Sequence, residues 1–78
     1  MFTLIKADGS VEKREEMRFN EMQDFVGGYV EVVGNIICNE DGGLLGLPVN
    51  KKHSNFVGNI IIGDIRDVKR EVNSNDKI

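Results

Sequence analysis

The chain has 78 residues, and its ten Lys and Arg against thirteen Asp and Glu give a formal net charge of −3. This mildly acidic balance argues against binding to nucleic-acid phosphates, and it is too weak for a good DNA mimic. No stretch approaches the roughly eighteen consecutive apolar residues of a membrane span. Residues 1–6 are too short and too lightly charged for a signal peptide, so we expect neither segment.

Cysteine and histidine usage limits the chemistry further. The single cysteine, Cys38, excludes an internal disulfide, and the single histidine, His53, excludes a multi-histidine or Cys/His metal cluster. We therefore expect no metal and no cofactor. A small secreted domain normally needs disulfides, so the lone thiol predicts a reducing cytoplasm. Without disulfides or metal, self-association is a common source of stability, which predicts a homo-oligomer.

The first predicted element is a β-hairpin. Residues 2–6 and 11–13 flank Asp8-Gly9, a dipeptide typical of tight turns between apolar runs. The charged residues 14–18 that follow are expected to form an exposed connection. 

A short helix is predicted next, and it begins near Asn20. The Asn20 side chain can cap the first free N–H groups, and Gln23 stands at the reciprocal capping-box position. Gly27-Gly28 ends the helix. One face is apolar, with Met22, Phe25 and Val26 at helical spacing. A helix of about two turns is unstable alone in water, so it must pack on a sheet.

A second hairpin is predicted around Gly34-Asn35, joining strands over residues 29–33 and 36–39. Simple register pairs Val33 with Ile36, Val32 with Ile37 and Glu31 with Cys38. The face with Val30, Val32 and Ile37 is the better core candidate. Tyr29 is expected to be partly buried, with its hydroxyl near the surface.

The sequence after residue 39 predicts short strands joined by turns and a loop. A turn at residues 40–43 leads into a strand at 44–47 that Pro48 ends, and residues 49–57 form a polar loop. Residues 59–62 and 65–68 are strand-like around Gly63-Asp64, which is either a hairpin or, as we favour, a glycine bulge. The sum is an α+β fold, with a small antiparallel sheet of five or six short strands and one short helix packed on it. Residues 1–70 form a single domain, and residues 71–78 are a frayed C-terminal tail.

No set of catalytic residues emerges from the sequence, so we expect no enzyme. Cys38 has Glu40 and Asp41 as its nearest charges, which disfavour a thiolate, so it is interpreted as a small core hydrophobe. His53 has no acid or nucleophile near it in sequence, so it is interpreted as an exposed loop residue. An enzyme would require the fold or an interface to supply one of them with a partner.

The segment Lys51-Lys52-His53 is the basic spot in the middle of the chain. Ordinary solvated lysines are the favoured interpretation. The alternative is capture of an anion, such as a nucleotide phosphate, with Asn50 and Asn55 directed at the base or sugar.

Three segments in order carry a resemblance: VGGYVEVV at 26–33, CNEDGGLLGLPVN at 38–50 and GNIIIGD at 58–64. The pattern VGGY-x-E-V, NE-x-G-x-L-x-GLP-x-N and GN-x-I-x-GD resembles a family of short phage and bacterial proteins known only as a domain of unknown function. The family commonly has a longer polar residue where Gly43 stands. The resemblance implies a phage or prophage context, a small intracellular domain in the host cytoplasm and no particular reaction.

The resemblance also emphasises one corner of the sheet, at Asn39-Glu40 and at Gly46, Pro48 and Asn50. Gly46 would let another backbone approach a strand, Pro48 would fix the exit from it, and Asn50 would bond a turn or reach a ligand. The corner is therefore either a structural brace or a surface for a ligand or partner. The candidate binding residues are Asn39, Glu40, Gly46, Pro48, Asn50, Lys51, Lys52 and His53.

Two functions remain open at this point. The preferred hypothesis is a non-enzymatic binding module that acts as a homo-oligomer on a host protein, because exposed strand edges can pair with another chain. The alternative is a binder or sponge for a small nucleotide signal in host–phage conflict, with pockets at the oligomer interfaces.

Overall fold

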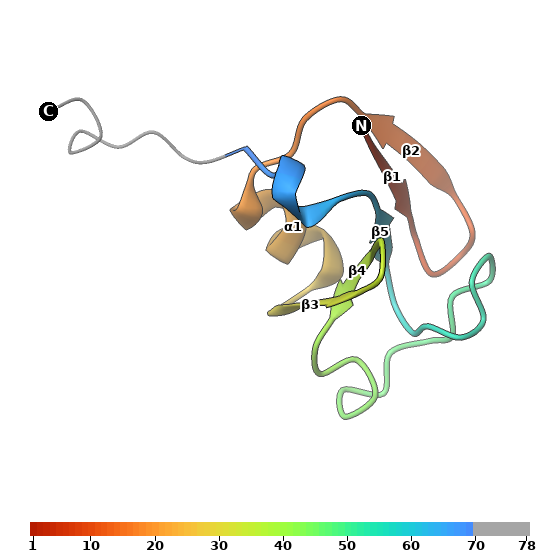
Figure 1. The fold of residues 1–78 in the computed structure, drawn as a ribbon. Helices are drawn as coiled ribbons and strands as arrows, with labels where there is room; N and C mark the ends of the chain where they lie inside the picture. The colour runs from red at the N-terminus through yellow and green to blue at the C-terminus, as the bar shows by residue number, and fades with distance from the viewer. Residues whose placement is uncertain (70–78) are drawn as a thin grey trace, which may run out of the picture.

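The computed structural model describes residues 1–69 and contains one antiparallel sheet with a short α-helix against it (Figure 1). The strand order is β2-β1-β5-β4-β3, so β2 and β3 are the two edges. The elements are β1 (Phe2–Ile5), β2 (Val11–Arg14), α1 (Phe19–Val26), β3 (Val30–Val33), β4 (Ile36–Asn39), β5 (Ile60–Ile62) and the 3₁₀ helix η1 (Ile65–Asp67). The α+β class is confirmed with five strands. The tail expected at 71–78 lies outside the described residues.

The two predicted hairpins are both present. In the first, β1 and β2 pair antiparallel around a turn in which the Asp8 carboxylate accepts hydrogen bonds from the backbone and hydroxyl of Ser10. In the second, β3 and β4 pair with the expected register, from Val33 opposite Ile36 to Glu31 opposite Cys38.

The helix α1 begins earlier than the capping pattern predicted. Arg18 is the N-cap, and Glu21 Oε1 accepts a hydrogen bond from the Arg18 backbone N–H at 2.8 Å. The cap assigned to Asn20 and Gln23 was therefore wrong, because the helix starts at Phe19 and both residues lie within it. The predicted end of the helix at Gly27 is confirmed. Gly27 adopts a left-handed φ of 85° and donates its N–H to the Gln23 carbonyl.

The connection before the helix is not merely an exposed linker, because Met17 is completely buried. Its carbonyl accepts a hydrogen bond from the Lys69 backbone N–H at 2.8 Å. The Lys69 ammonium also lies 3.0 Å from a Glu16 carboxylate oxygen. Lys69, which follows η1, is thus joined to the segment just before the N-terminal end of α1.

The core lies between α1 and one face of the sheet. Met22 and Val26 of the helix are buried against the central strands, and Phe25 packs on them, as their spacing predicted. A smaller cluster on the opposite face joins Ile5, Cys38 and Ile60. Phe56 packs against it from the loop of residues 40–59 between β4 and β5, called the long loop below. The full main cluster contains Phe2, Leu4, Met17, Met22, Val26, Ile37 and Ile61.

The expected core face of the second hairpin is only partly buried. Ile37 is fully enclosed, but Val32 is 43% exposed because its strand is at the edge of the sheet. Tyr29 is 69% exposed, so the expectation of partial burial was wrong.

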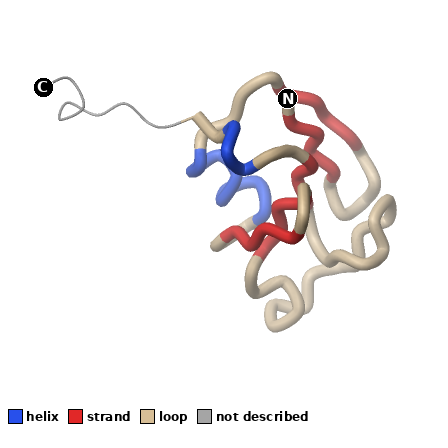
Figure 2. The backbone as a smooth tube through the Cα atoms, viewed as in Figure 1, coloured by secondary structure: helices blue, strands red, loops and turns tan. Residues whose placement is uncertain are grey.

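Two predicted strands are absent from the described residues. Residues 44–47 form turns instead, in which Leu45 N–H bonds the Asp41 carbonyl and Leu47 N–H bonds the Gly42 carbonyl (Figure 2). Gly63-Asp64 is neither a hairpin nor a bulge, because the Asp64 carboxylate accepts the backbone N–H of Arg66 and starts η1. Both segments satisfy their backbone locally and so do not join the sheet.

Candidate functional site

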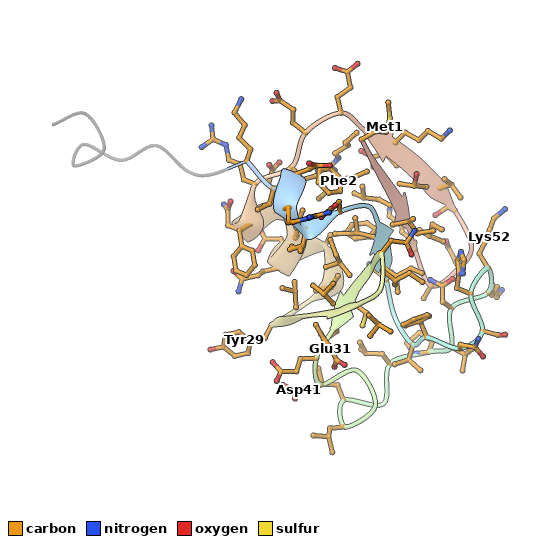
Figure 3. All side chains as sticks on the ribbon, in the orientation of Figure 1. Met1, Phe2, Tyr29, Glu31, Asp41 and Lys52 are labelled. Carbon is orange, nitrogen blue, oxygen red and sulfur yellow. The ribbon has the colours of Figure 1, made fainter. Side chains whose placement is uncertain are left out.

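The residues that the sequence singled out do not form one site. Lys51 donates its backbone N–H to the Ala7 carbonyl at 3.0 Å, which places the basic loop beside the β1–β2 hairpin. Glu40 donates its backbone N–H to the Tyr29 carbonyl at 2.8 Å, which places the other group beside β3. Figure 3 shows Lys52 on the opposite side of the molecule from Tyr29, Glu31 and Asp41. The candidate residues therefore divide into a basic end and a β3 end.

Asn50 is fully buried, and its side-chain amide forms hydrogen bonds with main-chain groups. Its Nδ2 donates to the carbonyls of Ile5, Lys6 and Gly58 at 3.0–3.3 Å. Its Oδ1 accepts the backbone N–H groups of Lys52 and His53 at 2.9 and 3.0 Å. Asn50 thus fixes the position of the basic loop against β1.

A second amide, Asn39, performs the same task at the other end of the loop. Its Nδ2 donates to the Val26 carbonyl at 2.9 Å, and its Oδ1 accepts the Asp41 N–H at 2.7 Å. Asn59, which the sequence analysis did not single out, bonds the Phe25 carbonyl and the Ala7 N–H, both at 2.9 Å. The three amides join α1, β1 and the long loop into a braced corner.

Gly46 and Pro48 shape the outer part of that corner. Gly46 has a left-handed φ of 67°, and a Cβ built there would meet no atom within 4 Å. The glycine therefore serves the turn, and the expected close approach of another backbone was wrong. The Pro48 carbonyl accepts the Gly58 N–H at 2.6 Å, which closes the loop on itself.

Two hollows flank the C-terminal end of α1. A cleft of about 290 Å³ lies between the helix and the loop, with Asp24, Phe25, Leu47 and Pro48 in its wall. The neighbouring hollow, of about 330 Å³, is lined by Gln23, Asp24, Gly27, Gly28 and Tyr29. Among residues 1–69, Asp24 is the one charged side chain that lines either hollow, and no cysteine, serine or histidine in that range lines them.

The Cys38 thiol lies where burial and a nearby negative charge oppose its ionisation. Burial raises the pKa of the Cys38 thiol, and the negative charge of Glu31 raises it further. The thiol donates a hydrogen bond to the Glu31 carbonyl at 3.6 Å, so the neutral form is the one that the site supports. Within residues 1–69 there is no group of three or more His, Cys, Asp and Glu side chains placed to hold a metal ion. No helix in that range is long and apolar enough to cross a membrane.

The β3 end carries exposed apolar side chains, a feature that the sequence analysis did not locate. Val32 and Val33 are 43% and 46% exposed, and the loop nearby adds Leu44 at 90% and Leu45 at 59%. Because β4 covers only one side of β3, the other side has no partner strand within residues 1–69. The free edge of β3 is therefore a strand edge with exposed apolar side chains.

One family model matches the chain over residues 1–76, and its description is Domain of unknown function (DUF3846). The chain belongs to this family. The matched range contains the five strands, α1 and η1 that residues 1–69 form. No curated protein matches the chain, and no solved structure matches it.

Proposed function

We propose that this DUF3846 domain is a non-enzymatic binding module that adds a strand of another polypeptide to the free edge of β3. Such strand addition draws its affinity from main-chain hydrogen bonds and its specificity from the flanking side chains. The observation that carries the proposal is the unpaired β3 edge, on which Val32 and Val33 are exposed.

The geometry of the second hairpin indicates which main-chain groups are free. The Tyr29 carbonyl accepts a hydrogen bond from Glu40, so its main chain faces the β4 side. The main-chain groups of successive residues point to alternate sides of a strand. The N–H and C=O groups of Glu31 and Val33 therefore also point toward β4, whereas those of Val30 and Val32 point away from the sheet. The N–H and C=O groups of Val30 and Val32 are therefore available to an incoming strand.

The opposite edge of the sheet is built differently. β2 carries Glu12, Lys13 and Arg14, and the Arg14 guanidinium lies 2.6 Å from a Glu12 carboxylate oxygen. Charged side chains on an edge strand oppose pairing with another chain, and lysine is the residue most used for this purpose. β3 has no lysine, arginine or proline. The contrast favours β3 as the edge that binds.

The partner that we propose is a protein of a bacterial host cell, met in its cytoplasm. The support is the resemblance of the ordered sequence pattern to short phage and bacterial proteins. The homo-oligomer that the sequence predicted is the case in which a second copy supplies the strand. A host protein and a second copy would both bind by strand addition, and the mass of the bound chain distinguishes them.

Site-specific photo-crosslinking tests the proposal. A photoreactive amino acid replaces Val32 in one variant and Lys13, on the β2 edge, in the matched control. We expect crosslinks from position 32 in a bacterial lysate and few from position 13, with mass spectrometry identifying a second copy or another protein. Equal crosslinking at both edges, or none at position 32, would refute binding at β3.

A second candidate function rests on the basic loop. Lys51 and Lys52 are exposed, none of the ion pairs within residues 1–69 involves them, and Asn50 accepts hydrogen bonds from the backbone of Lys52 and His53. A phosphate of a nucleotide-like ligand fits this chemistry. Thermal unfolding with a nucleotide panel tests it, because ligand at 100 times Kd adds about 2.7 kcal/mol. A shift lost in Lys51→Gln/Lys52→Gln supports the candidate, and no shift with any nucleotide eliminates it.

A further inference from the structure

The charges of this chain are separated along the sequence. Residues 19–50 contain five carboxylates, Glu21, Asp24, Glu31, Glu40 and Asp41, and no lysine, arginine or histidine. All ten lysines and arginines and the histidine lie before or after this range. The segment includes α1, the β3–β4 hairpin and the first part of the long loop.

The fold keeps this separation in space. Figure 3 shows Tyr29, Glu31 and Asp41 together at one end of the molecule, with Lys52 on the far side. Glu40 is bonded to the backbone of Tyr29, and Asp24 lines the hollow beside that tyrosine. The basic loop is joined to the opposite end of the sheet through the Lys51–Ala7 hydrogen bond. The β3 end is therefore the acidic end of the molecule.

Four of the five carboxylates are exposed, and none of the four has an ion-pair partner in the described part of the chain. They are Asp24, Glu31, Glu40 and Asp41. Glu21, in contrast, lies 3.7 Å from the Arg14 guanidinium and is already paired. The β3 end thus combines negative charge that is not neutralised with exposed apolar side chains.

We propose that the β3 edge binds an extended segment of another protein in which basic and apolar residues alternate. This inference rests on the proposed function, and it specifies the chemistry of the partner. Side chains alternate between the faces of a strand, so Val30 and Val32 share the helix face while Glu31 lies on the other. An added strand then places apolar residues beside the valines and lysine or arginine beside Glu31.

A second copy is the less suitable occupant of this edge. Antiparallel pairing of β3 with itself brings two copies of Glu31 near each other and adds the nearby carboxylates of both chains. Like charges at close cross-strand positions destabilise pairing. A basic segment is instead attracted by the same carboxylates, which also steer it toward the β3 edge as it approaches.

Fluorescence anisotropy with two labelled peptides provides the test. One short peptide alternates Lys and Val, and its matched partner alternates Glu and Val. We expect the Lys-Val peptide to bind at least about tenfold more tightly, and to bind about tenfold more weakly as NaCl rises from about 50 to 500 mM. We expect Glu31→Gln/Glu40→Gln to weaken binding severalfold, and Glu15→Gln, at an exposed carboxylate outside the acidic end, to leave it unchanged.

The possible results separate the two proposals. Equal binding of both peptides, or binding that is insensitive to salt and to Glu31→Gln/Glu40→Gln, overturns the basic partner but leaves β3 as a binding edge. Failure of the Lys-Val peptide to bind also overturns the basic partner, while crosslinking from position 32 decides the proposed function independently. Loss of Lys-Val binding in Val32→Pro, which removes the outward N–H without removing a hydrogen bond to β4, supports addition at this edge.

Discussion

Asn50 donates its side-chain amide to the carbonyl of Ile5, a residue 45 positions earlier in the chain, at 3.2 Å. The same amide forms hydrogen bonds with the Gly58 carbonyl and with the backbone of Lys52 in the basic loop. One buried side chain therefore joins the long loop to the edge of the core. Such a loop has no regular ladder for its main-chain groups, and a buried asparagine supplies the missing partners.

Replacing Asn50 by alanine is expected to lower the free energy of unfolding by about 3 kcal/mol, because buried carbonyl and N–H groups lose their partners. The exposed Asn55 provides the matched control, and Asn55→Ala is expected to stay within about 0.5 kcal/mol. Urea denaturation of both variants measures the difference. Equal stability of the two would show that the Asn50 amide does not brace the loop.

Two glycines provide a second pair of variants. A Cβ at Gly63 would overlap the buried ring of Phe2, whereas a Cβ at Gly43 would meet no atom within 4 Å. Gly63→Ala is therefore expected to cost about 1–3 kcal/mol in a tightly packed core. Gly43→Ala is expected to remain within about 0.5 kcal/mol of the natural protein. Thermal unfolding measures both, and a neutral Gly63→Ala would contradict the close packing of Gly63 against the Phe2 ring.

The Asp64–Arg66 pair predicts a pH effect at acid pH. Hydrogen bonds from the Arg66 side chain and backbone lower the pKa of Asp64 to about 2. Because the folded-state pKa lies below the ordinary value of 3.8, the pair contributes stability at pH above about 4 and loses it as pH falls toward 2. Both side chains are solvent-exposed, so the effect is small. Asp64→Asn should unfold with a weaker pH dependence between pH 2 and 5, and an unchanged dependence would contradict the pair.

The thiol of Cys38 is expected to be unreactive. Burial and the charge of Glu31 raise its pKa, so little thiolate exists at neutral pH. Alkylation by iodoacetamide at pH 8 should be much slower in the folded protein than in urea, and Glu31→Gln should accelerate it only slightly. A rate in the folded protein equal to that in urea would show that the thiol is not protected.

Local sequence signals predicted the two hairpins and the end of the helix. Asp8-Gly9 and Gly34-Asn35 encode their turns within a few residues, and the register of β3 and β4 follows from the second turn. Strands that depend on distant partners were less predictable. Leu44 and Leu45 resemble strand residues, but no strand within residues 1–69 pairs with them, and turns satisfy their backbone instead.

The candidate site was predictable only in part. The sequence indicated Asn39 and Asn50 but not that both would be enclosed by main-chain partners from α1 and β1. The free edge could not be identified, because strand order arises from the placement of β5 between β1 and β4, over a long separation in sequence. The capping role of Asp64 was visible in its spacing to Arg66, but the apolar Ile65 and Val68 favoured a strand.

Amide hydrogen exchange along β3, followed by NMR in dilute solution, tests the central claim most directly. The alternation along this strand predicts that the Val32 amide exchanges rapidly while the inward amide of Val33 is protected. Adding the Lys-Val peptide should then slow exchange at Val32. A Val32 amide that is already protected in the dilute protein would mean that the β3 edge is covered, and would contradict its role as a binding surface.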